Sequence, residues 1–258
     1  MTNSSSIVIG RDLLFAWTAR TIRARYQQSI LGWLWAIAQP AASVTIYTIV
    51  FTRIVKVDTG GIPYPVFSYV AVVPWAFLAA ALNDMTSSLV QNINLVQKIY
   101  FPREILPIAA ACARLMDFGI AFSLLMILMM IFQVPITATW VYLPLLLVIQ
   151  MALATGIGLA CAALNVFYRD IQSLLTLVIH LWFYASPIIY PVSLIPAKYH
   201  WVYFLNPMAG IIQGYRDVLL LGSSPGPSLL LAGALSFVVL FLGYWLFKRL
   251  EPLFADLV

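Results

Sequence analysis

Charge is absent from five long stretches of this 258-residue chain, and that distribution constrains the fold more than any other feature. The charge-free windows are 26–52, 59–83, 118–168, 171–197 and 218–247. A helix needs about 20 apolar residues to cross the ~30 Å hydrocarbon core of a bilayer, so each window can hold one span and the longest can hold parts of two. Charged residues make up only 9% of the chain, too few to give a soluble domain its charged surface. The sequence therefore predicts an all-α membrane protein.

Six transmembrane helices are expected, with an interfacial N-terminal region at 1–32 and a transmembrane domain at 33–258. The predicted spans are about 33–52, 66–89, 105–132, 140–163, 172–190 and 228–247. If both termini are cytoplasmic, the inner segments carry nine Lys and Arg residues and the outer loops carry four. Because cytoplasmic loops are enriched in these residues, we expect both termini inside.

A basic helix is predicted over residues 7–27, before the first span. It carries Trp and Leu beside its arginines, as do helices that lie in the headgroup layer. Arg20 and Arg23 fall on one arc of the helical wheel, whereas Arg25 sits off it. Two interpretations stay open. The helix is a simple anchor, or it binds an anionic lipid headgroup, because guanidinium matches phosphate in bidentate fashion.

Two segments have the pattern of neither a transmembrane span nor an ordinary polar loop. The inner stretch 91–104 is rich in amides and then carries Tyr100 and Phe101, which indicates either a protein contact or interfacial anchoring. The outer stretch 191–225 is aromatic, and Asn206 followed by proline predicts a helix over about 207–221. Such an apolar outer stretch is expected to dip back as short re-entrant helices at a pore mouth.

Aromatic side chains are frequent within the predicted spans. The relevant residues are Tyr69, Trp75, Phe77, Trp182, Phe183 and Tyr184. They are candidates for the wall of a pathway along which sugar rings slide, and core packing is the alternative. Ala152, Gly156 and Ala160 repeat at a spacing of four, which indicates close helix packing either between subunits or within the chain.

Enzymatic motifs are absent from the sequence. There is no P-loop, no zinc-protease motif and no nucleophile elbow, and we expect no metal site, no cofactor and no nucleic-acid partner. Within the spans only Asp84 and Asp117 can lie at depth, and Asp117 is three residues from Arg114, which predicts a helical salt bridge. The chain is therefore not expected to be an enzyme.

Four motifs in order resemble one known family. They are Arg20 to Trp35 with Pro40, Lys98 to Pro107, Asn165 to Ile171 with Ser186 to Tyr190, and Asn206-Pro207 with Tyr215-Arg216. Together they are similar to the permease subunits of ABC-type polysaccharide exporters, which move O-antigen, capsule and teichoic acid chains. The resemblance covers essentially the whole chain.

This resemblance implies a homodimer in the bacterial cytoplasmic (inner) membrane, surrounded by membrane lipids, with two separate subunits that bind ATP and Mg²⁺. It implies that Arg20, Arg23 and Arg25 bind the pyrophosphate of a lipid-linked glycan. The implied outer gate comprises Tyr190, Tyr203, Asn206 and Arg216. The implied contacts with the ATPase are Gln97, Lys98, Tyr100, Phe101, Pro102, Arg103, Glu104, Arg169 and Asp170.

Other transport functions remain as alternatives. An ABC-type exporter of teichoic acid, capsule, a small lipid or a drug would share the fold and the partner. A self-contained secondary carrier is a more distant alternative, since the scarcity of intramembrane carboxylates argues against it. An intramembrane transferase would need an acid cluster or metal site that the sequence does not offer.

Overall fold

The computed structural model describes residues 3–27, 34–54, 58–98 and 101–255, and within these ranges the chain is helical, without strands. The α-helices are α1 (Asn3–Tyr26), α2 (Trp35–Ile49), α3 (Tyr64–Gln91), α4 (Ile93–Lys98), α5 (Ile105–Ile131), α6 (Leu143–Phe167), α7 (Asp170–Tyr184), α8 (His200–Tyr203), α9 (Pro207–Leu219) and α10 (Pro227–Leu250). A π-helix (Val50–Ile54) continues α2, and 3-10 helices occupy Ala138–Tyr142, Val192–Leu194, Ala197–Tyr199 and Glu251–Ala255. The all-α prediction is confirmed for the described residues.

Within the described residues, four helical segments are long and apolar enough to cross a membrane. They are Tyr64–Gln91, Ile105–Ile131, Ala138–Phe167 and Pro227–Phe254. The helices in the first and fifth predicted spans, α2 and α7, have 15 residues each, or about 22 Å at 1.5 Å per residue. The fifth span was predicted to reach residue 190, but α7 ends at Tyr184. Pro187 accounts for this difference, because proline disfavours helical geometry in the residue before it and cannot donate a backbone hydrogen bond.

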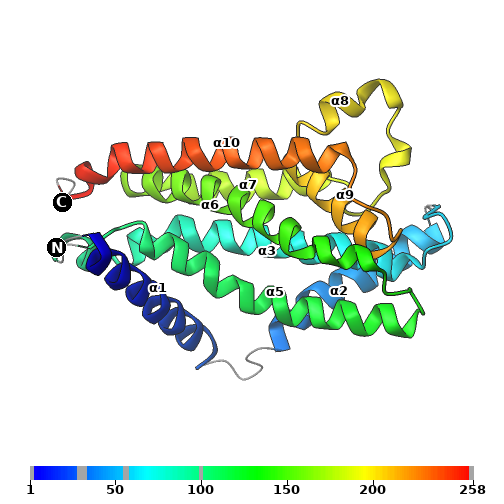
Figure 1. The fold of residues 1–258 in the computed structure, drawn as a ribbon, viewed down its shortest axis with the longest axis horizontal. Helices are drawn as coiled ribbons and strands as arrows, with labels where there is room; N and C mark the ends of the chain where they lie inside the picture. Colours follow the sequence, from blue (N-terminus) through cyan, green and yellow to red (C-terminus); the bar gives the residue numbers. More distant parts are fainter. Residues whose placement is uncertain (1–2, 28–33, 55–57, 99–100, 256–258) are drawn as a thin grey trace.

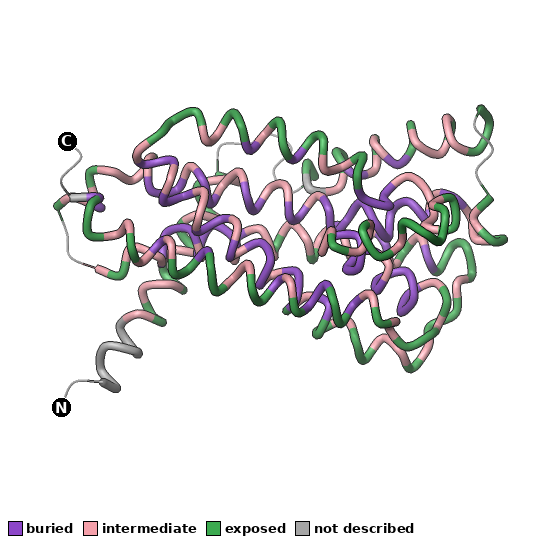
Figure 2. Tube along the Cα trace, turned by 90° about the horizontal axis from the view of Figure 1, so that it is seen from above, coloured by how far each residue is buried: buried purple, intermediate pink, exposed green. Residues whose placement is uncertain are grey.

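The bundle is built around α3, which lies between α5 on one side and α6 with α10 on the other (Figure 1). The buried part of the chain runs through the middle of the bundle, and exposed residues follow its outer helices (Figure 2). Large apolar side chains are among the exposed ones, including Leu230 and Phe241 on α10 and Met130 on α5. An apolar outer surface of this extent suits a bilayer or a second subunit better than water.

Hydrogen bonds connect the centre of α3 to α6 and α9. Pro74 lies inside α3, and its carbonyl oxygen accepts a hydrogen bond of 3.0 Å from Nε2 of the buried Gln150 on α6. The hydroxyl of Tyr215 on α9 donates to Oε1 of Gln150 at 2.9 Å. One amide therefore links three helices, and it satisfies polar groups that would otherwise be costly inside the membrane.

Two glycines allow α6 and α10 to cross closely. A Cβ atom added at Gly156 would lie 2.6 Å from the backbone nitrogen of Leu240 on α10. A Cβ added at Gly243 would overlap the carbonyl oxygen of Gly156. Of the two roles predicted for the small residues of span four, the structure supports packing within the chain at Gly156.

The end of the bundle opposite the start of α1 holds the segment predicted to be re-entrant (Figure 1). Helix α9 begins at Pro207, and the Asn206 side chain accepts a hydrogen bond from the Met208 backbone nitrogen at 3.0 Å, as the sequence predicted for a helix cap. Helix α9 is mostly buried against α10, α3 and α6. The short α8 projects beyond it, at the end of the molecule opposite the start of α1 (Figure 1).

Candidate functional site

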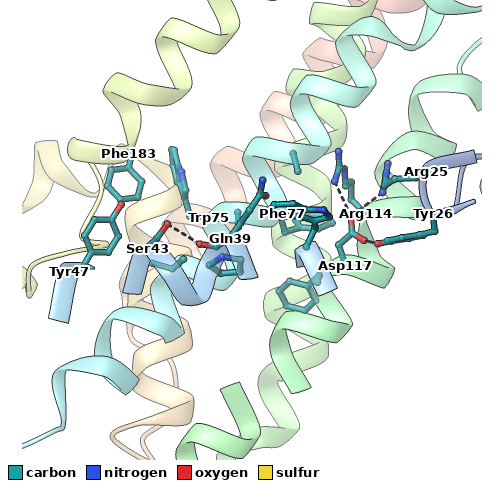
Figure 3. Close-up of a pocket in the computed structure, with 16 residues that line it drawn as sticks. Arg25, Tyr26, Gln39, Ser43, Tyr47, Trp75, Phe77, Arg114, Asp117 and Phe183 are labelled. Carbon is teal, nitrogen blue, oxygen red and sulfur yellow. Dashed lines mark hydrogen bonds and ion pairs between the residues drawn. The ribbon is translucent and has the colours of Figure 1, made fainter. Parts of the chain in front are cut away.

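A cavity of about 310 Å³ opens between the middle of the bundle and the end of α1. We call it the aromatic cavity, and its lining includes Arg25, Tyr26, Gln39, Ser43, Tyr47, Trp75, Phe77, Arg114, Asp117, Phe118 and Phe183. Tyr47 and Phe183 lie together at one side of it, and Arg25, Tyr26, Arg114 and Asp117 lie at the other (Figure 3). The cavity therefore has an aromatic half and a charged half.

The aromatic half of the cavity is lined by Trp75 and Phe183, and two more of the residues predicted to line a pathway, Trp182 and Tyr184, pack against these rings. The Trp75 ring contacts Trp182 and Phe183 edge-on, with ring centroids 5.7 and 5.8 Å apart. Phe183 also packs against Tyr184 at 5.2 Å and against Tyr47 of α2 at 5.9 Å. Edge-to-face contacts of this kind stabilise a rigid wall. Tyr47 was not among the predicted residues, because its position in span one gave no sign that it would face α7.

The other two predicted aromatic residues lie deeper in the packing. Phe77 lines the aromatic cavity but is only 3% exposed, and its ring stacks edge-on against Phe118 at 5.7 Å. Tyr69 is fully buried and borders a separate cavity of about 350 Å³ with Val44 and Leu124. In this structure both contribute more to helix packing than to an open wall.

The charged half belongs to a group of four side chains that we call the ionic cluster: Arg25 of α1, Asp84 of α3, and Arg114 and Asp117 of α5. All of them except Asp84 line the aromatic cavity. Arg25 contacts Asp84 at 2.5 Å and Asp117 at 3.0 Å. Arg114 contacts Asp84 through two nitrogens at 2.7 and 2.9 Å, and Asp117 at 2.9 Å. Each carboxylate is thus shared by two guanidinium groups, which makes the cluster neutral as a whole.

Tyr26 adds a second link between α1 and the ionic cluster, because its hydroxyl donates a hydrogen bond to Asp117. Burial and this hydrogen bond raise the pKa of Tyr26 to about 12. The phenol therefore stays protonated at physiological pH and remains a donor to the carboxylate.

The three arginines predicted to bind phosphate are not placed together. Arg25 belongs to the ionic cluster, whereas Arg20 and Arg23 are exposed. The Arg20 guanidinium lies 4.4 Å from the centroid of the Trp17 ring. The helical salt bridge predicted between Arg114 and Asp117 is confirmed, but sequence reasoning missed its connection to Asp84 and Arg25.

The four residues predicted at the outer gate do converge, and we call them the outer cluster. The hydroxyls of Tyr190 and Tyr203 are 3.2 Å apart. Arg216 is buried, and it donates to the carbonyl of Tyr190 at 3.3 Å and to that of Ile188 at 3.0 Å. Asn206 accepts a 2.8 Å hydrogen bond from the Trp182 indole, which connects the outer cluster to the aromatic wall.

The segment 91–104, which we call the inner loop, carries seven of the nine residues predicted to meet an ATPase. Lys98 and Pro102 are exposed, Gln97 is half-buried, and Phe101 packs on the core. Arg169 and Asp170, at the second predicted contact, are exposed. Tyr100 lies outside the described residues.

Two residues of that loop are bound by the end of the chain. Lys248 of α10 contacts Glu104 at 2.7 Å and Glu251 at 2.9 Å. Arg103 donates to the carbonyl of Glu251 at 2.6 Å. These contacts join the inner loop to the end of α10.

Metal ligation has no obvious place in the described part of the chain, where no three His, Cys, Asp or Glu side chains converge. The carboxylates of the ionic cluster are already engaged by arginines. The cavities instead offer aromatic faces, hydroxyls and guanidinium groups, which suit sugars and phosphates.

The part of the chain that the structure describes holds four apolar helices long enough to cross a bilayer, so the chain is a multi-pass membrane protein. It belongs to the ABC-2 type transporter family, whose model matches residues 12–220.

Named relatives cover nearly the whole chain. It is 27% identical over 248 residues to the O-antigen export system permease protein RfbA of Klebsiella pneumoniae, covering 96% of this chain and 95% of that protein. A protein of the same name from Myxococcus xanthus is 29% identical over 252 residues, with 95% of each covered. The polysialic acid transport protein KpsM of Escherichia coli is 27% identical over 242 residues, covering 90% of this chain and 91% of that protein.

Proposed function

We propose that this chain is the permease subunit of an ATP-driven exporter that moves a lipid-linked polysaccharide, O-antigen-like in kind, across the cytoplasmic membrane. The observation that carries the proposal is the aromatic cavity, whose aromatic wall leads away from a charged end that contains two arginines. Aromatic faces contact sugar rings without holding them at one position, so a glycan can slide past. Guanidinium groups bind a phosphate headgroup. The family and the names of the relatives support the same substrate class.

The proposed topology has six spans and cytoplasmic termini. The four long helices supply four spans, and α2 with its π-helix and α7 supply the two shorter ones. The start of α1 and the end of α10 lie at the same end of the bundle, as an even number of spans requires (Figure 1). The excess of Lys and Arg at that end favours the cytoplasmic side.

The proposed assembly is a homodimer with two ATPase subunits docked on its inner face. ATP binding and hydrolysis occur in those subunits. The inner loop and the exposed pair Arg169 and Asp170 are the docking surface. Because Lys248 and Glu104 join the loop to α10, closure of the ATPases would move α10 and, through its close crossing, α6.

In the proposed path the glycan moves outward along the wall formed by Trp75, Trp182 and Phe183. The indole of Trp182 is held by Asn206, so this wall and the outer cluster would move together. Opening at the outer end would then require separation of the Tyr190 and Tyr203 hydroxyls.

Export by the reconstituted complex tests this function. The chain and its ATPase partner are placed in proteoliposomes with the lipid-linked glycan on the ATPase side, and a lectin reports glycan that reaches the opposite side. We expect ATP-dependent transfer, which falls severalfold when Trp75 and Phe183 are both replaced by alanine. Trp245→Ala is the matched control, because Trp245 is 51% exposed on α10 and lines none of the cavities described here. ATP hydrolysis without glycan transfer by the wild type would refute the proposal.

A further inference from the structure

The ionic cluster lies where two cavities meet. Besides the aromatic cavity there is an inner cavity of about 330 Å³, whose lining includes Trp17, Thr21, Arg25, Asp84, Ser87, Gln91 and Asn92. Arg25 lines both cavities, Asp84 lines the inner one, and Arg114 and Asp117 line the aromatic one. The ionic cluster therefore lies on the shared border of the two cavities, where a headgroup moving directly from one to the other would meet it.

The same side chains hold the end of α1 in place. Arg25 pairs with both carboxylates, and Tyr26 donates to Asp117. Thr21, one turn earlier, donates only to the backbone of α1 itself, at Trp17. Among the described residues, the polar attachment of this end of α1 to α3 and α5 thus depends on Asp84 and Asp117.

We propose that the ionic cluster is an exchangeable phosphate site, in which Asp84 and Asp117 are the resident anions and Arg25 and Arg114 are the ligands of an incoming phosphate headgroup. Phosphate offers each guanidinium the same bidentate geometry as a carboxylate, with more oxygens and more negative charge. When phosphate binds between the two arginines, Arg25 releases Asp84 and Asp117, so the end of α1 shifts from its place against α3 and α5. This shift opens the inner cavity to the aromatic cavity.

Partial exposure makes such an exchange feasible. The four side chains are between 17% and 28% exposed, so water and a headgroup can reach them without unfolding the bundle. A fully buried pair would hold its charges too strongly, since removing one partner from a dry site costs several kcal/mol. The site also assigns a binding role to Arg114, which the sequence pattern linked only to Asp117.

This inference rests on the proposed function, and it is tested by the position of α1. Nitroxide labels are attached at Ala16→Cys on α1 and Ser123→Cys on α5, both exposed positions, after Cys112 and Cys161 are replaced by alanine. The complex with its ATPase is placed in zwitterionic nanodiscs and diluted with unlabelled chain. Polyprenyl diphosphate should change the distance distribution between the labels, whereas the uncharged polyprenol should leave it unchanged.

A second arm replaces the zwitterionic lipid with phosphatidylglycerol. If only the polyprenyl diphosphate moves α1, the ligand is the substrate headgroup. If phosphatidylglycerol moves it equally, the site still exchanges carboxylate for phosphate, but its ligand is a membrane phospholipid. If neither moves α1 while intact-complex mass spectrometry shows diphosphate bound, the exchange is refuted.

Removing the two carboxylate charges of the ionic cluster gives an independent test, in which the affinity for diphosphate is measured. Asp84→Asn with Asp117→Asn removes the competing anions and should tighten diphosphate binding by about tenfold, the equivalent of about 1.4 kcal/mol. Asp12→Asn is the matched control, because it removes an acid of α1 whose salt bridge to Arg11 is exposed. If the double variant does not fold, Asp84→Asn alone, which leaves Asp117 to hold Arg25, should tighten binding by a smaller factor. Unchanged affinity in a folded variant would overturn the proposal.

The proposed function and this inference fail in different ways. If the wild-type complex transfers no glycan in proteoliposomes, the function is wrong whatever α1 does. If the wild type transfers glycan and binds diphosphate while α1 does not move, the function stands and the exchange is wrong.

Discussion

The crossing of α6 and α10 predicts a large cost for adding a single methyl group. In Gly156→Ala the new Cβ atom would lie 2.6 Å from the backbone of Leu240 and its neighbour. Ordinary contacts between a carbon and a backbone oxygen are about 3.3–3.6 Å, so the helices must separate by roughly 0.7–1.0 Å. A gap of that size forfeits a quarter to a half of the dispersion energy along the interface. We expect a loss of about 2–3 kcal/mol for Gly156→Ala, and a larger loss for Gly243→Ala, whose new Cβ would overlap the Gly156 carbonyl oxygen.

Thermal stability in detergent, followed by size-exclusion chromatography of heated samples, measures this loss. Gly119→Ala on α5 is the matched control, because its new Cβ would meet nothing within 4 Å. Removing a helical glycine there should instead stabilise the protein by about 1 kcal/mol. The double variant Gly156→Ala with Gly243→Ala should cost less than the sum, since the first separation already makes room for the second methyl. If Gly156→Ala were as stable as Gly119→Ala, close packing within the chain would be refuted.

Three further changes test the polar contacts. Asn206→Ala removes the cap of α9 and the partner of the Trp182 indole, and it should lower stability by about 1–2 kcal/mol in the same heating assay. Gln150→Leu leaves the buried Tyr215 hydroxyl unpaired and should cost about 1–3 kcal/mol, and adding Tyr215→Phe should recover part of that loss. Lys248→Ala should change stability by less than about 1 kcal/mol because the side chain is partly exposed, but it should reduce stimulation of the ATPase by glycan, measured as phosphate release. An unchanged ATPase response would show that the inner loop does not act through α10.

Local sequence signals predicted the helices and several of their ends. The cap at Asn206 was predictable because a capping side chain and the proline after it act within one turn of the helix. The early end of α7 was also encoded locally, by Pro187, although the charge-free window concealed it. A charge-free window shows where a transmembrane helix can lie, but it does not show at which residue that helix ends.

The ionic cluster could not be predicted in full because its partners are far apart in the sequence. Arg25 lies 59 residues from Asp84 and 92 from Asp117, and no local period determines which helices will meet. The separation of Arg25 from Arg23 was partly predictable. Residues two positions apart point about 200° away from each other on a helix, so these two arginines cannot serve one ligand from one face.

The composition of the purified complex tests the central claim most directly. The tagged chain is purified from its native host in mild detergent, and the intact complex is weighed with its bound lipids. We predict two copies of this chain with two copies of an ATPase, carrying a polyprenyl-linked glycan. A chain isolated alone, with no ATPase and no glycolipid, would contradict the account.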